Sequence, residues 1–142
     1  MDITKMSHLK YTLENVIRYA GDRIKVAGDI LDFTDFFIDD AILPYDRAAK
    51  AKRITEPPEA IPILREFRDE LAKQEDFSHA ALEQLMQRFL GDRNRKITEI
   101  IHALRVAVTG KGVGLGMFET LEILGKERVL RRIDRTLTEP VT

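Results

Sequence analysis

The sequence predicts an all-α fold without a β-sheet. Apolar residues recur at the three- and four-residue spacing of a helix through almost all of the 142 residues. Proline, glycine or a helix-capping residue stands between successive apolar stripes, as expected between helices. Only Leu104, Val106 and Val108 alternate as a strand would, and an isolated strand would have no partner in this chain.

Two helices are expected before Pro44. One apolar stripe defines the first helix, which ends at Gly21-Asp22: Leu9, Leu13, Val16, Ile17 and Ala20. The second helix, over 22–38, has an acidic face opposite its apolar one: Asp29, Asp32, Asp35 and Asp39. Carboxylates along one straight helix do not wrap around an ion, so this face indicates solvent exposure rather than a metal site.

Two further helices are expected in the middle of the chain. Pro58 suits the first turn of a helix over 59–75. Ser78 is a favourable N-cap for the next helix, and Phe77 and Leu82 around it form a hydrophobic staple. That helix is expected to end near Gly91-Asp92 or Asn94.

The last third of the chain is predicted to hold three shorter helices. The first covers 95–108 and leads into a glycine-rich loop. The second is closed by Gly125, and the third carries the apolar stripe Val129, Leu130, Ile133 and Leu137.

Composition excludes several classes of protein. Hydrophobic residues make up 44% and charged residues 33%, which are the proportions of one globular domain or two very small ones. No uncharged apolar run approaches the ~18 residues that a membrane span needs, and no signal-peptide pattern is present. The absence of cysteine excludes disulfides, thiolate metal sites and cysteine nucleophiles. We therefore expect a cytoplasmic protein that does not associate with membranes.

Charge is distributed unevenly along the chain. Residues 1–76 carry 12 basic and 16 acidic side chains, and residues 77–142 carry 11 basic and 8 acidic ones. A polyanionic partner would favour the C-terminal half, although a small asymmetry is also typical of an ordinary solvated surface.

The glycine-rich segment Thr109–Gly116 does not fit a known phosphate loop. Gly112 follows Lys111 where the Walker pattern needs Ser or Thr, and the glycine offsets of the dinucleotide pattern are not met. The segment predicts a flexible loop whose backbone can approach a flat or bulky ligand, followed by a helix N-terminus. The three histidines are scattered, and no nucleophile or paired carboxylates indicate catalysis or a metal site.

Four arginines of the last helix lie at offsets 0, 3, 4 and 7, so they share one face: Arg128, Arg131, Arg132 and Arg135. Such a face serves either surface solubility or contact with phosphates.

Residues 103–137 carry a resemblance to a known family. They read Ala-Leu-Arg-Val-Ala-Val-Thr-Gly, a loop, Met-Phe-Glu-Thr-Leu-Glu-Ile-Leu-Gly-Lys-Glu-Arg and an arginine-rich last helix. This order resembles the C-terminal end of bacterial-type glutamyl-tRNA synthetases. Weaker similarity continues upstream, through Glu75–Ser78 and the segment from Gly21 to Phe37, and so covers nearly the whole chain.

The resemblance implies an anticodon-binding region of the class I synthetase type. Its fold would be a pair of right-angled helical bundle lobes, roughly 1–40 and 41–142. In that family a separate Rossmann domain joins glutamate to its tRNA with ATP and Mg²⁺, and the signatures of that domain are absent here. We therefore expect a non-catalytic, monomeric region that needs no cofactor, binds glutamate tRNA and is covalently joined to a catalytic domain. The alternative is a stand-alone helical module that kept the fold but binds a protein.

The resemblance also implies site residues. Arg105 matches a family arginine that contacts the anticodon, and Arg23 matches one that tests its third base. Gly114, Leu115, Gly116 and Met117 match the loop and helix start that pack on the bases, with Leu115 and Met117 offering apolar surface. Two departures stand out, because the loop lacks the proline common in relatives and Gln87 occupies a position that can be arginine. Phosphate contacts are expected from the basic residues of the C-terminal half: Arg93, Arg95, Lys96, Lys111, Arg128, Arg131, Arg132 and Arg135.

Overall fold

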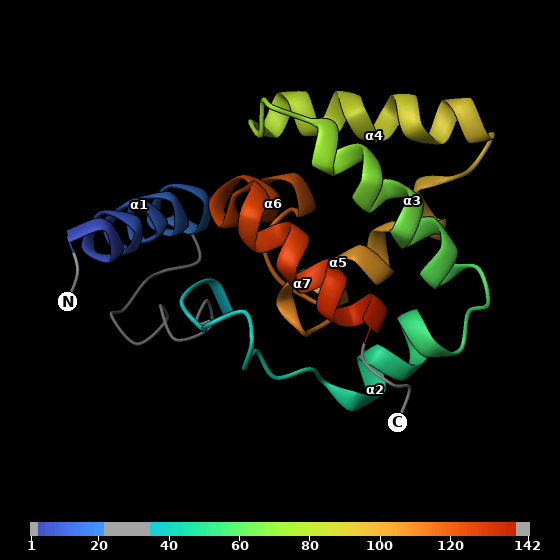
Figure 1. Ribbon diagram of the computed structural model, residues 1–142, viewed down its shortest axis with the longest axis horizontal. Helices are drawn as coiled ribbons and strands as arrows, with labels where there is room; N and C mark the ends of the chain where they lie inside the picture. The colour runs from blue at the N-terminus through green and yellow to red at the C-terminus, as the bar shows by residue number, and fades with distance from the viewer. Residues whose placement is uncertain (1–2, 22–34, 139–142) are drawn as a thin grey trace.

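The computed structural model describes residues 3–21 and 35–138, and within these ranges it is entirely helical with connecting loops. The elements in chain order are α1 (Ile3–Ala20), α2 (Arg47–Lys50), the π-helical turn η3 (Ala51–Thr55), α3 (Ala60–Lys73), α4 (His79–Arg93), the 3-10 turn η4 (Ile97–Glu99), α5 (Ile101–Thr109), α6 (Met117–Leu124) and α7 (Lys126–Thr138). Figure 1 shows α5 near the centre of the molecule and α1 at one side, next to α6. The predicted all-α fold is confirmed.

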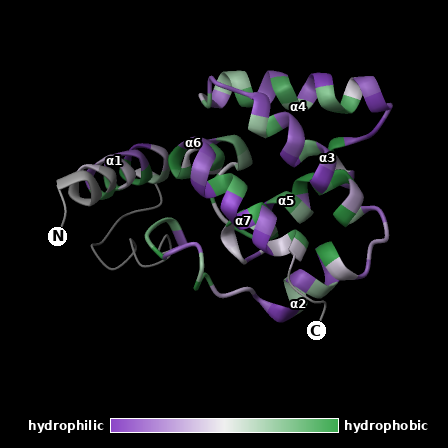
Figure 2. Ribbon diagram, viewed as in Figure 1, coloured by the Kyte–Doolittle hydropathy of each residue, from purple (hydrophilic) through white to green (hydrophobic). Residues whose placement is uncertain are grey.

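The core is built where α5 meets α3, α6 and α7. Six of the nine residues of α5 are buried: Ala103, Leu104, Val106, Ala107, Val108 and Thr109. Figure 2 shows hydrophobic segments on α5 and α6 and hydrophilic bands on α3, α4 and α7. The apolar residues therefore cover most of the circumference of α5 and leave one face to His102 and Arg105, and this wide apolar surface explains why the sequence also alternates like a strand.

The cap predicted for α4 is confirmed. The Ser78 hydroxyl accepts a hydrogen bond from the Ala81 amide at 3.3 Å, and the helix ends at Asn94 in the left-handed conformation. At the same end, a carboxylate oxygen of Glu122 accepts from the His79 amide at 2.6 Å. The other carboxylate oxygen of Glu122 bonds Arg18 and Tyr19, so one side chain of α6 ties α1 and α4 together.

Three predictions about helices need correction. The helix expected over 95–108 is interrupted at Ile100, whose φ of −126° separates η4 from α5. The helical segment over 47–55 was not predicted, since it carries only one buried apolar residue, Ile54. Residues 22–34 of the helix expected over 22–38 lie outside the described part, and residues 37–43 form turns and loop.

The segment 35–43 lies against α7, and the solvated acidic face predicted here is wrong at Asp35, which is only 6% exposed. Asp39 is exposed as predicted, and Asp29 and Asp32 lie outside the described residues. Asp40, which was not assigned to that face, has a side chain that is 11% exposed and faces three arginines of α7. The proposed division into lobes near residue 40 stays a prediction.

Candidate nucleic-acid interface

Arg105 lies beside the glycine-rich loop, as the resemblance implies. Its side chain leaves α5 half-buried, and Nη1 donates a hydrogen bond of 2.6 Å to the Leu115 carbonyl oxygen. Gly114 lies against the same nitrogen, because a Cβ added there would be 3.7 Å from Nη1. The bond to the backbone carbonyl thus holds the guanidinium at the edge of the loop.

The loop is anchored at both ends and exposed in its middle. At its start, the Gly110 carbonyl accepts from the Asp46 amide at 2.7 Å, and a Cβ on Gly110 would clash with the Pro44 carbonyl oxygen. Lys111 lies next, with its Nζ 3.0 Å from Oδ1 of the buried Asp35. Gly112, Val113 and Gly114 are exposed, and Val113 is 74% exposed. The loop therefore presents backbone and one apolar side chain to solvent.

The apolar surface predicted from Leu115 and Met117 is not found. Both side chains belong to the core, with exposed fractions of 2% and 4%. Apolar residues at the end of a loop next to a short helix are needed to seal that helix against the core. Gly116 is exposed at the N-cap of α6. The exposed apolar residue of this loop is Val113, which the sequence analysis passed over even though it lies between two glycines.

Two other residues implied by the resemblance are not brought to this loop by any described contact. Gln87 is exposed on α4, which packs mainly against α6. Arg23 lies outside the described residues, so its predicted role has no structural test here.

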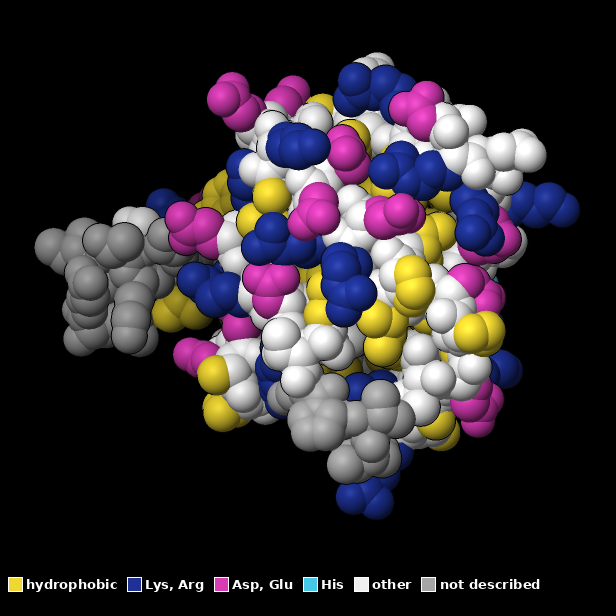
Figure 3. Space-filling model, turned by 45° about the vertical axis from the view of Figure 1, so that its right-hand side comes forward, with side chains coloured by type: hydrophobic (Ala, Val, Ile, Leu, Met, Phe, Trp, Pro, Cys, Tyr) yellow, Lys and Arg dark blue, Asp and Glu magenta, His cyan; other side chains and the backbone are white. Residues whose placement is uncertain are grey.

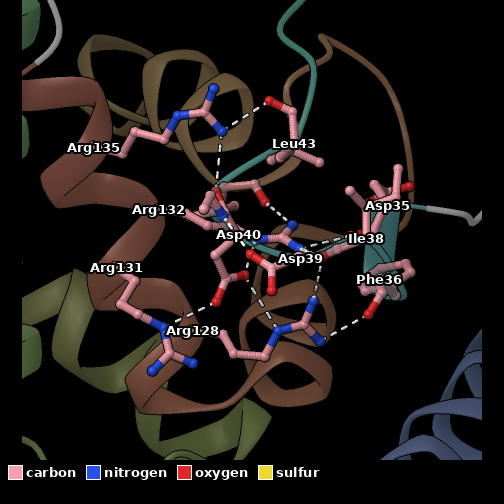
Figure 4. Close-up of polar contacts among 12 residues, drawn as sticks. Asp35, Phe36, Ile38, Asp39, Asp40, Leu43, Arg128, Arg131, Arg132 and Arg135 are labelled. Carbon is pink, nitrogen blue, oxygen red and sulfur yellow. Dashed lines mark hydrogen bonds and ion pairs between the residues drawn. The ribbon is translucent and has the colours of Figure 1, made fainter.

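The arginines of α7 share one face as predicted, but most of that face meets the segment 35–43 (Figure 4). Arg128 donates to the carbonyl oxygens of Phe36 and Ile38 at 2.7 and 3.1 Å. Arg135 donates to those of Asp40 and Leu43 at 3.0 and 2.9 Å. Both guanidiniums are therefore engaged in holding this segment.

Arg132 is a clear correction to the predicted phosphate contacts. It is fully buried, and its Nε lies 2.6 Å from Asp40 Oδ1. Its remaining nitrogens donate to the carbonyl oxygens of Val108, Asp35 and Ile38. A side chain enclosed in this way does not reach a phosphate. Arg131 differs, since its side chain is 61% exposed although Nε bonds Asp40 at 3.0 Å.

Asp40 is held ionised by this cluster. Burial alone raises the pKa of Asp40, but hydrogen bonds from Arg132 and Arg131 outweigh it, so the pKa lies below its usual value. One carboxylate thus neutralises part of a cluster that contains Arg128, Arg131 and Arg132.

Other basic residues also face acids or lie among them. Arg93 is 3.5 Å from Glu66, and Arg95 is 3.4 Å from Glu99. On the face shown in Figure 3, Lys and Arg side chains alternate with Asp and Glu, so neither sign predominates.

A basic run that the sequence analysis missed lies beside α5. Residues 47–53 contain four basic side chains and no acid, Arg47, Lys50, Lys52 and Arg53, and they form α2 and η3. The acidic excess of residues 1–76 hides this run when charge is counted over the whole half of the chain. A count of basic and acidic side chains over shorter windows would have found it.

Among the residues that the structure describes, no group of His, Asp and Glu is arranged to hold a metal ion. In the same ranges, no helix is both long enough and apolar enough to cross a membrane.

Comparisons with known proteins agree with the resemblance. Residues 4–137 match the family described as "Anticodon binding domain". The chain is 33% identical over 127 residues to glutamate–tRNA ligase 2 of Caldicellulosiruptor saccharolyticus, covering 89% of this chain and 26% of that protein. It is 41% identical over 93 residues to glutamate–tRNA ligase of Thermus thermophilus, covering 66% of this chain and 19% of that protein.

A solved structure shows the same fold. The glutamate tRNA ligase from Elizabethkingia meningosepticum superposes with a TM-score of 0.75 at 20% identity, over 92% of this chain and 28% of that chain. The chain spans about a quarter of the length of the curated relatives it matches. From the match over residues 4–137, the chain belongs to the anticodon binding domain family.

Proposed function

We propose that this chain recognises the anticodon of glutamate tRNA as the recognition region of a glutamate–tRNA ligase. The observation that carries the proposal is Arg105, fixed at the edge of an exposed glycine loop within a member of the anticodon binding domain family. The relatives that match are glutamate–tRNA ligases, which supports glutamate tRNA as the partner.

The chemistry of the loop suits unpaired bases. Anticodon bases can be splayed out and read on their Watson–Crick edges by side chains and backbone groups. A guanidinium offers a planar fork of donors to a base edge. The exposed backbone of Gly112 and Gly114 allows a base to approach closely, and Val113 supplies an apolar contact. The pairing of Arg105 with a carbonyl fixes the direction of its fork before RNA arrives.

We propose that ligation itself belongs to the remainder of a longer protein. The residues described here would then bind RNA without ATP, Mg²⁺ or another cofactor of their own. In this proposal the region is monomeric, is covalently joined to its catalytic domain and works in the cytoplasm.

The test replaces Arg105 by Ala and measures binding to a fluorescent anticodon stem-loop of glutamate tRNA. We expect a loss of about 1–3 kcal/mol, concentrated on the RNA with the intact anticodon. The unchanged chain should bind a stem-loop with a scrambled anticodon more weakly than the intact one. The Arg105→Ala variant should bind the two stem-loops with about equal, weak affinity. Arg105→Lys keeps the charge but not the fork, so it should lose most of the discrimination while keeping its salt dependence.

Arg65→Ala on α3 is the matched control, since Arg65 is exposed and lies on a different helix. It should leave the preference for the intact anticodon unchanged. Equal weakening of both RNAs by Arg105→Ala would contradict base reading at this residue. The alternative function, a protein-binding module that does not bind tRNA, requires that neither RNA binds even at low salt.

A further inference from the structure

The second half of the basic run, Lys52 and Arg53, lies on the π-helical turn η3. The π-helical turn is closed by a hydrogen bond of 2.8 Å from the Glu56 amide to the Ala51 carbonyl. Its apolar contact with the core is Ile54, which is 2% exposed. Lys52 is exposed and Arg53 is half-buried. π-Helical turns are rare and often occur at functional sites.

The turn η3 packs against α5, the helix that carries Arg105. His102 precedes Arg105 by three positions, so both lie on one face of α5. The pKa of His102 lies below its usual value, first because of burial and then because of the positive charges of Arg53, Arg105 and Lys52. Lys52 and Arg53 of η3 and His102 and Arg105 of α5 therefore form one cluster.

No acid balances the η3 part of this cluster within the described residues. Neither the Lys52 side chain nor the Arg53 side chain makes a hydrogen bond or an ion pair with a described residue. Like charges held together repel one another, and a bound anion relieves that repulsion. The arrangement is thus opposite to that of α7, where Asp40 lies among the arginines.

The glycine loop is bordered by α2, which leads directly into η3. A Cβ added at Gly112 would lie 4.0 Å from the Cβ of Ala49 in α2, and the Gly110 carbonyl accepts a hydrogen bond from Asp46, the residue before α2. α2 therefore borders the loop on one side, while Arg105 borders it on another. An RNA strand whose base reaches Arg105 would carry its backbone past α2 and η3.

We infer that Lys52, Arg53 and His102 form a phosphate-binding surface for the RNA strand whose bases Arg105 reads. This inference rests on the proposed function. Its ligand is the phosphodiester backbone, so the surface adds affinity and position without reading sequence. Most of the salt-dependent binding should therefore come from this surface and not from the arginines of α7.

The test is the double variant Lys52→Gln/Arg53→Gln, with binding to the intact and scrambled stem-loops measured over a salt series. Two lost contacts to a single strand should reduce the slope of log K against log salt by about 1.4. Because the two lines of log K against log salt should meet at about 1 M salt, affinity at 0.1 M should fall about 25-fold for both RNAs. The ratio between the two RNAs should stay as in the unchanged chain.

The matched control is Lys10→Gln/Lys73→Gln, which removes two positive charges elsewhere. These side chains are 79% and 75% exposed. Lys10 is on α1, and Lys73 is at the far end of α3 from η3, about 20 Å along that helix. The Debye length is ~10 Å at 0.1 M salt, so this variant should bind within about twofold of the unchanged chain.

Three outcomes would overturn the surface. An equal loss in both double variants would show an effect of net charge alone. The slope of log K against log salt could be the same in Lys52→Gln/Arg53→Gln as in the unchanged chain, while the unchanged chain still prefers the intact anticodon. That result would reject the phosphate-binding surface and leave the proposed function standing. A failure of the unchanged chain to bind either RNA would reject the proposed function and, with it, this surface.

Discussion

The chain carries two basic regions that differ in whether their charge is available. The α7 arginines, Arg128, Arg131, Arg132 and Arg135, follow a regular helical spacing and meet the segment 35–43. The η3 cations, Lys52 and Arg53, follow no such pattern and have no acidic partner in the described ranges. Periodic charge on a helix therefore identifies a shared face, but it does not show that the face is exposed.

The energetic reason is the cost of removing a guanidinium from water. A buried charge costs several kcal/mol unless an opposite charge and hydrogen bonds replace its hydration. Arg132 meets that requirement with Asp40 and three backbone carbonyls. These groups come from the segment 35–43 and from α5, so the α7 arginines join that segment to the core. Their role in the described structure is stability.

The largest effect should follow from Asp40→Asn. Removal of this carboxylate leaves Arg128 and Arg132 with uncompensated charge in a poorly solvated site. We expect the free energy of unfolding to fall by about 3–5 kcal/mol, measured by urea denaturation at pH 7. Lys52→Gln/Arg53→Gln, measured in the same way, should change it by less than about 0.5 kcal/mol, since surface positions contribute little. Equal effects of the two variants would remove the contrast between the regions.

Asp40→Asn should also alter how the free energy of unfolding changes as the pH falls. Because the folded pKa of Asp40 is below its ordinary value of 3.8, its stabilisation is complete above the unfolded pKa and is lost as the pH falls through the lower folded pKa. The unchanged chain should thus lose this contribution below about pH 4. Asp40→Asn lacks this contribution at every pH. The difference in free energy of unfolding between the two proteins should therefore narrow as the pH is lowered.

The fold was largely predictable from the sequence because its signals are local. The Ser78 cap, the glycines that end α5 and α6, and the apolar stripe of α7 all lie within one or two helical turns of the features they determine. The interruption at Ile100 was not predictable, because apolar spacing continues across it. The helix over 47–55 escaped prediction because only Ile54 is buried there.

The site was predictable only where neighbours in sequence form it. Arg105 and Leu115 are ten residues apart in sequence, and the structure brings the Arg105 guanidinium to the Leu115 carbonyl; their contact with the anticodon stays a prediction. The partners of Arg128 and Arg135 lie 88–95 residues away, so helical spacing cannot show that they cover α7. Leu115 and Met117 were expected at the surface because the resemblance implies that they pack on the bases, whereas both side chains belong to the core.

A smaller effect should be seen in the pH dependence of RNA binding. The pKa of His102 is lowered by burial and by Arg53, Arg105 and Lys52, so deprotonation is favoured in the absence of RNA. A phosphate nearby would favour the protonated form, which makes binding tighter as the pH falls from about 7.5 to 5.5. The gain is up to about tenfold for each pH unit by which RNA raises this pKa.

His102→Gln is the control for that measurement. It removes the titration but keeps a polar side chain, so its affinity should vary less with pH than that of the unchanged chain. Fluorescence anisotropy with the anticodon stem-loop at fixed ionic strength provides the comparison. The same pH dependence in both proteins would place the RNA backbone away from His102.

The smallest effect should come from Arg131→Gln, and it is the sharpest test of the contrast. Arg131 is the most exposed of the α7 arginines in ion pairs with Asp40, so it is best placed to reach a phosphate. Its pair with Asp40 is largely solvated, so its loss should cost at most about 1 kcal/mol of stability. If α7 serves stability, RNA affinity should change less than about twofold and the salt slope should stay constant. A slope reduced by about 0.7 would instead show one phosphate contact at Arg131. The basic surface would then extend from η3 to α7, and exposure of individual side chains would decide RNA binding within both regions.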